Sequence, residues 1–498
     1  MLERLRKIYQ RLTAGGSTEE QAVQSGIWVT GINVGDRVLQ LVKVVILARL
    51  LSPEAFGLLG IALLVVAALR QLSVLGFDAA LVQHQNENVD EYLNTVWIMK
   101  MVRWLVIAAI AVVSAPFIAQ FFDEPQAAPL IMVIAIANLL LAIQNPAIVY
   151  FRKDLNFHKE FMYTMSGRVA NLSTAVAIAV LYRSVWALVL GIVAMNLVKV
   201  ALSYLIHDYR PSVEFNMEYA KEMFDFGKWL LISGIFAFGL TQGDDAFVGW
   251  FFAAAALGYY QLGYRYSNAP ATEVTQVINR VAFPALSKVQ DSTQKLRRGV
   301  FRVLRLSMVI SLPMALGIVA VAPQFVIVAF GEEWRSMIPL MQVLAVWGAF
   351  RAVTKIPASV FKAVGRPEYD AYTLILKVAF IALTIYPAAE RFGVVGVAYV
   401  IVAQGILVEP IRLYLMLNLI EARASELIQP ILYPVAGSLV MFSVTAGADR
   451  YIFTRTGILK LCGLIALGAV VYGIVMILIE RTTTFKFIGL YRRIRQGI

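Results

Sequence analysis

The chain has 498 residues, of which 59% are hydrophobic and 15% are charged, and its mean hydropathy is +0.71. Soluble domains carry about 25% charged residues, so this composition excludes an ordinary soluble protein and places much of the chain in a lipid bilayer. The net charge of +12 would suggest nucleic-acid binding in a soluble protein. Here the cations cluster between apolar stretches, as the positive-inside rule describes, so we expect no nucleic-acid partner.

Residues 1–25 contain no apolar core of the kind that a cleaved signal peptide requires. Apolar residues instead repeat at helical spacing among basic ones, at Leu2, Leu5, Ile8 and Leu12. This pattern predicts an interfacial helix on the anionic cytoplasmic leaflet.

Fourteen apolar stretches follow, each long enough to cross about 30 Å of hydrocarbon as a helix. We expect spans at 26–50, 54–76, 92–120, 128–150, 161–182, 185–206, 223–248, 252–284, 299–329, 336–362, 370–388, 393–418, 428–448 and 457–480. The predicted class is therefore an all-α polytopic membrane protein with about 14 transmembrane helices. An even number of spans places both termini on one side of the membrane.

The charges of the connecting segments decide which side this is. Basic residues gather near residues 4–11, 152–159, 288–298 and 481–495, whereas acidic pairs occupy 123–124, 244–245 and 332–333. Because basic loops stay in the cytoplasm, we expect both termini to be cytoplasmic and the protein to lie in the inner membrane.

A shift of about 200 residues brings two parts of the chain into register. Gly26 and Trp28 then align with Gly227 and Trp229, and the turn 53–57 aligns with 254–258. Two parallel halves of six spans are a known transporter plan. The predicted domains are an N-terminal segment (1–25), an N-lobe (26–206), a C-lobe (207–418), two extra spans (419–480) and a basic tail (481–498).

Several charged residues fall inside the predicted spans, where a charge is costly and usually faces a water-filled cavity or a partner. Asp36, Gln40 and Lys43 share one helical face at i, i+4 and i+7. We expect a cation-lined cavity for an anionic substrate such as a lipid pyrophosphate, because guanidinium groups suit phosphate. Its candidate residues are Arg37, Lys43, Arg168, Lys199, Arg265, Arg351 and Lys355.

Other charges have competing interpretations. Arg70, Arg280 and Arg412 lie near span ends, where snorkelling to the interface is the favoured interpretation. The candidates for ion coupling are Asp36, Asp244, Asp245 and Glu273. Asp36 could equally be half of a buried pair, and Asp244 and Asp245 could be solvated carboxylates of an external turn.

The sequence contains no phosphate-binding GxxxxGK[ST] motif, and no long external loop that could hold paired catalytic carboxylates. The histidines His84, His158 and His207 lie in different loops, so we expect neither a metal site nor a cofactor, with H⁺ or Na⁺ coupling left open. Gly57 and Gly258 begin corresponding spans of the two halves, where close helix packing is favoured and bending is the alternative.

Three segments carry a family resemblance. Residues 47–58 (LARLLSPEAFGL), 280–291 (RVAFPALSKVQD) and 330–334 (FGEEW) resemble Wzx-type polysaccharide flippases of the colanic- and teichuronic-acid exporter branch. That branch belongs to the multidrug/oligosaccharidyl-lipid/polysaccharide superfamily, and the resemblance extends over about residues 20–420. It implies two six-span lobes in a V, two extra spans, alternating access and an undecaprenyl-pyrophosphate oligosaccharide as substrate.

We therefore expect a flippase for lipid-linked oligosaccharide and no enzymatic activity. The alternative is a cation-coupled drug antiporter of the same superfamily, although such a protein should carry a carboxylate excess rather than the cation excess seen here. A membrane glycosyltransferase or polymerase is disfavoured by the short external loops. Expected partners are the lipid-linked oligosaccharide, anionic lipids near the basic tail and proteins of a glycan-assembly complex.

Overall fold

The computed structural model describes residues 18–71, 90–154, 156–217, 238–239, 241–289, 292–366, 368–452 and 457–483. All regular structure in these ranges is helical. The chain divides into two compact units, Met1–Gly258 and Tyr259–Ile498. The predicted N-terminal interfacial helix, the basic tail and most of the predicted span 223–248 lie outside the described residues.

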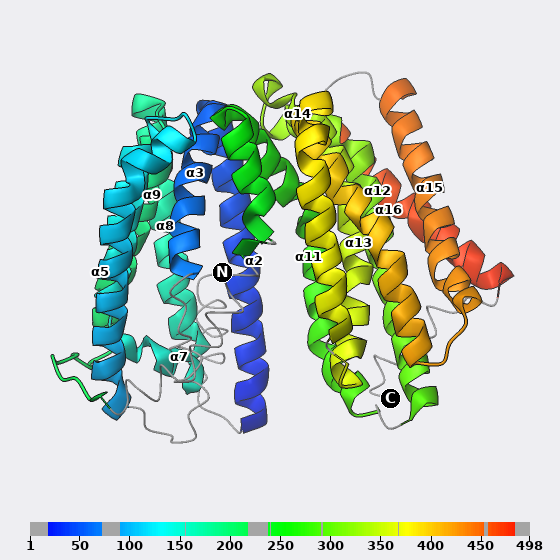
Figure 1. The fold of residues 1–498 in the computed structure, drawn as a ribbon, viewed down its shortest axis with the longest axis horizontal. Coiled ribbons are helices and arrows are strands. Elements are labelled where there is room, and N and C mark those ends of the chain that lie inside the picture. Colours follow the sequence, from blue (N-terminus) through cyan, green and yellow to red (C-terminus); the bar gives the residue numbers. More distant parts are fainter. Residues whose placement is uncertain are drawn as a thin grey trace, which may run out of the picture. The chain divides into compact units, whose positions relative to one another are not determined.

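Unit 1 is built from long apolar helices that pack along their lengths (Figure 1). They are α2 (Thr18–Leu50), α3 (Pro53–Gln71), α5 (Asp90–Phe121), α6 (Ala127–Ala142), α8 (Phe157–Tyr182) and α9 (Trp186–Ile206). Helix α8 packs against both α2 and α9, and α6 packs against α3, α5 and α9. Their small and branched side chains form a closely packed interior, with Ala135, Ala175 and Ala187 fully buried.

The predicted span 128–150 is bent rather than straight. Helix α6 is followed, across a bend of 81°, by the short helices η1 (Pro146–Val149) and α7 (Tyr150–Lys153). Asn145 caps the new direction because its side chain accepts a hydrogen bond of 3.0 Å from the backbone N–H of Ala147, and proline at the first position suits a helix start.

The turns that the sequence register aligns lie against each other at the starts of α3 and α11 (Ala254–Ser287). A Cβ atom added to Gly57 would lie 1.7 Å from the carbonyl oxygen of Ala254, and one added to Gly258 would lie 2.3 Å from that of Pro53. The contact is reciprocal, because Gly57 meets Ala254 and Gly258 meets Pro53. The register aligns Pro53 with Ala254, just as it aligns the two glycines. Close packing is therefore the reason for glycine at these two positions.

Helix α11 begins in unit 1 and continues into unit 2. The other helices of unit 2 are α12 (Thr293–Ala329), η2 (Glu332–Trp334), α13 (Met337–Ala363), α14 (Glu368–Leu419), η3 (Ala424–Leu427), α15 (Ile428–Tyr451) and α16 (Ile458–Thr482). Helix α12 packs against α13, α15 and α16. Helix α14 breaks at Gly393, whose φ of 62° is readily adopted only by glycine, so it accounts for the two predicted spans 370–388 and 393–418.

Among the described residues, nine helices are long and apolar enough to span a membrane, and the bent pair of α6 with η1 and α7 would make ten. The predicted spans 26–50 and 252–284 coincide with α2 and α11, which carry several charged residues. The prediction of an all-α membrane protein is confirmed. The grouping into two six-span lobes, the domain bounds and the orientation of the termini stay predictions.

Candidate functional site

The first polar site lies within unit 1, where α2, α8 and α9 meet. The carboxylate of Asp36 on α2 forms an ion pair with the guanidinium of Arg168 on α8. Their side chains are 26% and 31% exposed, respectively. Asp36 is therefore paired, as one of its two predicted interpretations requires, but the pair is accessible rather than fully buried.

Lys43 lies about two turns further along the same face of α2. Its ammonium donates a hydrogen bond of 3.1 Å to the side-chain oxygen of Asn171 on α8. Lys43, Arg168 and Asn171 line a small pocket together with Leu39 and Gln40. The predicted polar face of α2, with Gln40 and Lys43, therefore faces α8 and this pocket.

Lys199 on α9 completes what we call the cationic cluster, defined as Asp36, Lys43, Arg168, Asn171 and Lys199. Its ammonium lies 5.5 Å from the centroid of the Tyr163 ring, a cation–π contact, and within electrostatic reach of Arg168 and Asp36. Gly167 permits this approach, because a Cβ there would lie 3.0 Å from two carbon atoms of the Lys199 stem.

The cationic cluster contains three cations and one carboxylate, so it carries an excess of positive charge. Arg37, also predicted as a cavity residue, is exposed on α2 immediately beside Asp36. Such a cluster offers ammonium, guanidinium and amide donors to an anion, and these are the groups that bind phosphate.

The predicted cations of unit 2 lie on α11 and α13. Arg351 on α13 donates a hydrogen bond of 3.3 Å to the Tyr264 hydroxyl on α11, whereas Arg265 and Lys355 are exposed. Lys355 is within electrostatic reach of Arg351 and Asp370. These contacts do not test whether Arg265, Arg351 and Lys355 bind the substrate.

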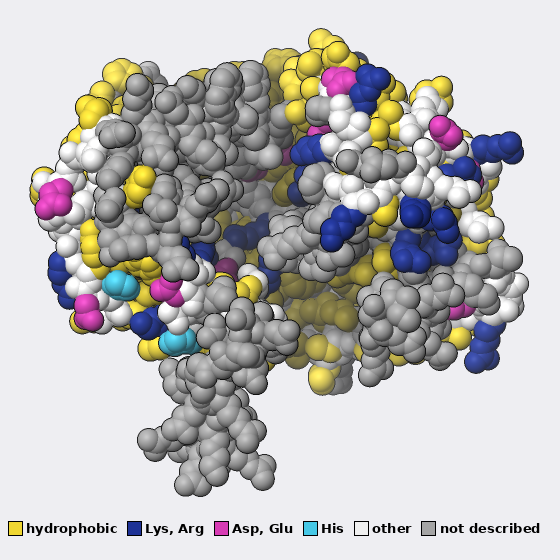
Figure 2. All heavy atoms as spheres, turned by 90° about the horizontal axis from the view of Figure 1, so that it is seen from below, with side chains coloured by type: hydrophobic (Ala, Val, Ile, Leu, Met, Phe, Trp, Pro, Cys, Tyr) yellow, Lys and Arg dark blue, Asp and Glu magenta, His cyan; other side chains and the backbone are white. Residues whose placement is uncertain are grey.

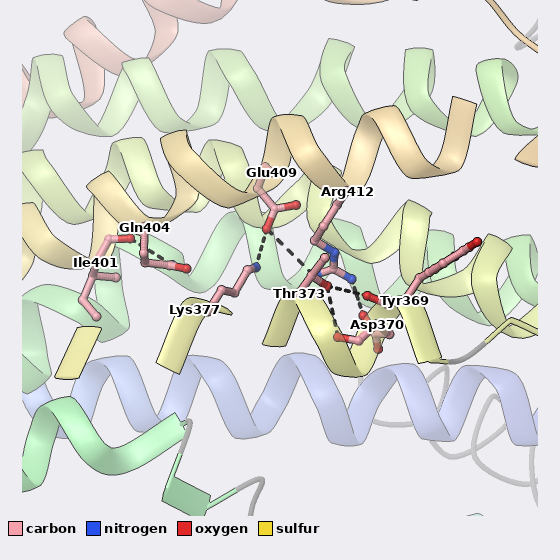
Figure 3. Close-up of polar contacts among 8 residues, drawn as sticks. All are labelled: Tyr369, Asp370, Thr373, Lys377, Ile401, Gln404, Glu409 and Arg412. Carbon is pink, nitrogen blue, oxygen red and sulfur yellow. Dashed lines mark hydrogen bonds and ion pairs between the residues drawn. The ribbon is translucent and has the colours of Figure 1, made fainter. Parts of the chain in front are cut away.

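Unit 2 also contains a buried charge network, defined as Asp370, Lys377, Glu409 and Arg412 (Figure 3). Lys377 and Asp370 lie before the break in α14, Glu409 and Arg412 lie after it, and the side chains point toward one another. The Lys377 ammonium pairs with Glu409, and the Arg412 guanidinium pairs with Asp370. A second Arg412 nitrogen lies 3.8 Å from the same Glu409 oxygen.

Three members of the charge network are enclosed by protein, with side-chain exposures of 11% for Lys377, 2% for Glu409 and 7% for Arg412. The expectation that Arg412 snorkels is therefore wrong. It remains inside because Asp370 and Glu409 supply counter-charges there. The sequence indicated the charges but not their pairing; the only local signal was that Glu409 and Arg412 share a helix face at i and i+3.

The remaining carboxylate candidates are less defined. Asp244 and Asp245 are half-buried within the helical residues 241–251. The side chain of Glu273 is not among those that the structure describes. Within the described ranges, no group of three or more His, Cys, Asp or Glu side chains could hold a metal ion. Ion coupling through these carboxylates stays a prediction.

Comparison with known proteins assigns the chain to a family. The model of a family described as "Polysaccharide biosynthesis protein" matches residues 46–339, more than half of the chain. The chain belongs to this family. The matched region contains Arg168, Asn171 and Lys199 of the cationic cluster but ends before the charge network.

Two characterised relatives are similar to this chain over most of their length. The lipopolysaccharide biosynthesis protein WzxC of Escherichia coli K12 is 28% identical over 386 residues, which cover 76% of this chain and 78% of WzxC. The teichuronic acid biosynthesis protein TuaB of Bacillus subtilis 168 is 24% identical over 80% of this chain and 83% of TuaB. The name of TuaB agrees with the teichuronic-acid branch that the sequence resembles.

The fold of this chain is also that of a solved flippase. The inward closed conformation of the lipid II flippase MurJ matches with a TM-score of 0.69 and 14% identity, over 91% of this chain and 99% of MurJ. At this identity the similarity shows the fold alone. The chain therefore shares the fold of MurJ.

Proposed function

We propose that this protein flips an undecaprenyl-pyrophosphate-linked oligosaccharide from the cytoplasmic to the outer leaflet by alternating access. The observation that carries the proposal is the cationic cluster, an excess of positive charge between apolar helices of a polysaccharide biosynthesis family member. WzxC and TuaB, named for polysaccharide biosynthesis, and the fold of a lipid II flippase support it.

The physical problem is the head group of the substrate. A pyrophosphate and several sugars cannot cross about 30 Å of hydrocarbon unaided, because each polar group would lose its hydrogen bonds to water. A polar pocket lets the head group cross while the lipid tail stays in the bilayer.

The cationic cluster fits the charge of this head group. Its three cations and one carboxylate leave positive charge that is costly within a membrane protein, and a pyrophosphate would compensate it. Lys43 offers donors to the pocket from α2, and Arg168 and Asn171 offer donors from α8. Arg37, Arg265, Arg351 and Lys355 are proposed to guide the head group along its path.

We propose that the protein moves its substrate without making or breaking covalent bonds. We place both termini in the cytoplasm, from the distribution of basic loops. Coupling to H⁺ or Na⁺ would use Asp36, Asp244, Asp245 or Glu273. Association with glycan-assembly proteins is compatible with this role.

A translocation assay tests the proposal. The purified protein is reconstituted into liposomes that contain fluorescent undecaprenyl-pyrophosphate oligosaccharide, and a glycosidase is added outside. Glycan on the inner leaflet is protected in protein-free liposomes, and we expect the protein to abolish this protection with time. Full protection with folded protein, across several glycans and imposed ion gradients, would contradict flipping and favour the antiporter.

A further inference from the structure

A second basic site lies at the start of α12, in unit 2. An open pocket of about 680 Å³ is lined by Gln294, Arg297, Arg298, Phe301, Arg302, Arg305 and Glu426. Its lining holds four arginines against one glutamate. Figure 2 shows the face of the molecule on which Lys and Arg side chains gather.

One of the four arginines builds the pocket wall. Arg297 binds both carboxylate oxygens of Glu426, at 2.9 and 2.5 Å, and donates to the backbone oxygen of Glu421 at 3.0 Å. Glu426 also accepts a hydrogen bond of 2.8 Å from the backbone N–H of Arg423. The loop before α15 is therefore fixed to α12, and the charge of Arg297 is balanced by Glu426.

The other three arginines give the pocket its positive charge. Arg298 and Arg302 are exposed and Arg305 is half-buried. From Arg298 to Arg305 the helix rises seven residues, or about 10 Å, so the guanidinium groups cover a range of depths. Guanidinium groups bind phosphate oxygens in a bidentate manner that lysine cannot reproduce.

The sequence places this pocket at a membrane surface. After Arg305, residues 306–329 of α12 contain no charged residue, and α12 is among the helices that can span a bilayer. Arg305 therefore lies at the boundary of the apolar segment. The basic residues around it mark this end of α12 as the one predicted to face the cytoplasm.

We infer that this pocket binds the head group of an anionic phospholipid from the cytoplasmic leaflet. Basic pockets between spans on that side are suited to lipid phosphates, and the Phe301 ring offers an apolar surface to the glycerol backbone and the first methylene groups. The inference does not depend on what the protein transports.

Native mass spectrometry of the full-length protein in detergent tests the inference, with phosphatidylglycerol and phosphatidylcholine of identical acyl chains as probes. We expect phosphatidylglycerol to bind preferentially. The variant Arg298→Gln/Arg302→Gln/Arg305→Gln should lose at least about tenfold in affinity, since each basic residue near a lipid surface contributes substantially. The single variant Arg302→Gln, at an exposed position, should lose part of this affinity. It replaces the triple variant in the test if the triple variant does not fold.

The matched control is Lys288→Gln/Lys295→Gln/Lys362→Gln, which removes three exposed cations of unit 2 that do not line the pocket. It should bind phosphatidylglycerol as the parent protein does. Equal loss in both triple variants would overturn the inference in favour of general charge attraction, and so would equal binding of phosphatidylcholine. A third titration uses undecaprenyl pyrophosphate: if the arginine variant loses only that lipid, the pocket serves the transported substrate and the inference is wrong.

Discussion

The cationic cluster of unit 1 and the charge network of unit 2 use the same residue types for different ends. In the cluster, three cations share one carboxylate, and the Asp36–Arg168 pair is partly accessible. In the network, two cations meet two carboxylates, and Lys377, Glu409 and Arg412 are almost fully enclosed. We expect the accessible cations of the cluster to be available to a substrate, and the paired, enclosed charges of the network to hold the two halves of α14 together. The following experiments test this difference.

The largest effect is expected for Glu409→Gln, which leaves Lys377 without its counter-charge. Breaking a buried ion pair from one side costs about 3–5 kcal/mol, so the free energy of unfolding in an SDS titration should fall by that amount. Glu390→Gln, at an exposed position of the same helix, is the control and should change little. Similar stabilities for the two variants would show that the network does not support the fold.

The double variant Lys377→Met/Glu409→Leu should be more stable than Glu409→Gln. Replacing both members of a buried pair by apolar residues is often neutral or stabilising by about 1–4 kcal/mol relative to the pair, because neither charge is left uncompensated. A double-mutant cycle in the same SDS titration measures this coupling. Additive losses from the two single substitutions would contradict a direct interaction.

For the cationic cluster, we expect a substitution to lower the flipping rate and to leave the stability unchanged. Lys43→Gln should slow the initial rate of flipping about tenfold, which corresponds to losing one charge-assisted hydrogen bond of roughly 1.5 kcal/mol or more. Its stability should match that of the parent because Lys43 is not fully buried. Lys153→Gln, a half-buried cation on α7, is the control. A Lys43 variant that unfolds more easily but flips normally would assign the cluster a structural role.

Only a small effect on stability is expected for Asp36→Asn. Accessible ion pairs contribute about 0–1 kcal/mol, so removing the carboxylate beside Arg168 should lower the free energy of unfolding by no more than this. The same SDS titration measures it. A loss comparable to that of Glu409→Gln would remove the distinction between the two sites.

Local sequence patterns predicted much of the fold. Apolar stretches and their breaks located the helices closely, and the boundary at 393 coincides with the break at Gly393. The register that aligned Gly57 with Gly258 identified two turns that touch in the structure. These features depend on residues close in the chain or on repetition, which one sequence displays.

The pairing of charges could not be predicted in this way. Lys377 and Glu409 are 32 residues apart, and Arg412 and Asp370 are 42 apart. Position near a span end made snorkelling the better interpretation of Arg412, and only the folding back of α14 reveals its partners. For the cationic cluster, the helical spacing of Asp36 and Lys43 indicated one polar face, but not that Arg168 and Asn171 lie opposite it.

The central claim is that the cationic cluster recognises the pyrophosphate of a lipid-linked glycan. The most direct measurement compares the flipping rates of undecaprenyl-pyrophosphate oligosaccharide and of the same oligosaccharide linked to undecaprenol without phosphate, in liposomes containing the parent protein or Lys43→Gln. We predict that the parent protein flips the pyrophosphate substrate faster and that Lys43→Gln removes this preference. Equal preference in both proteins would contradict the claim.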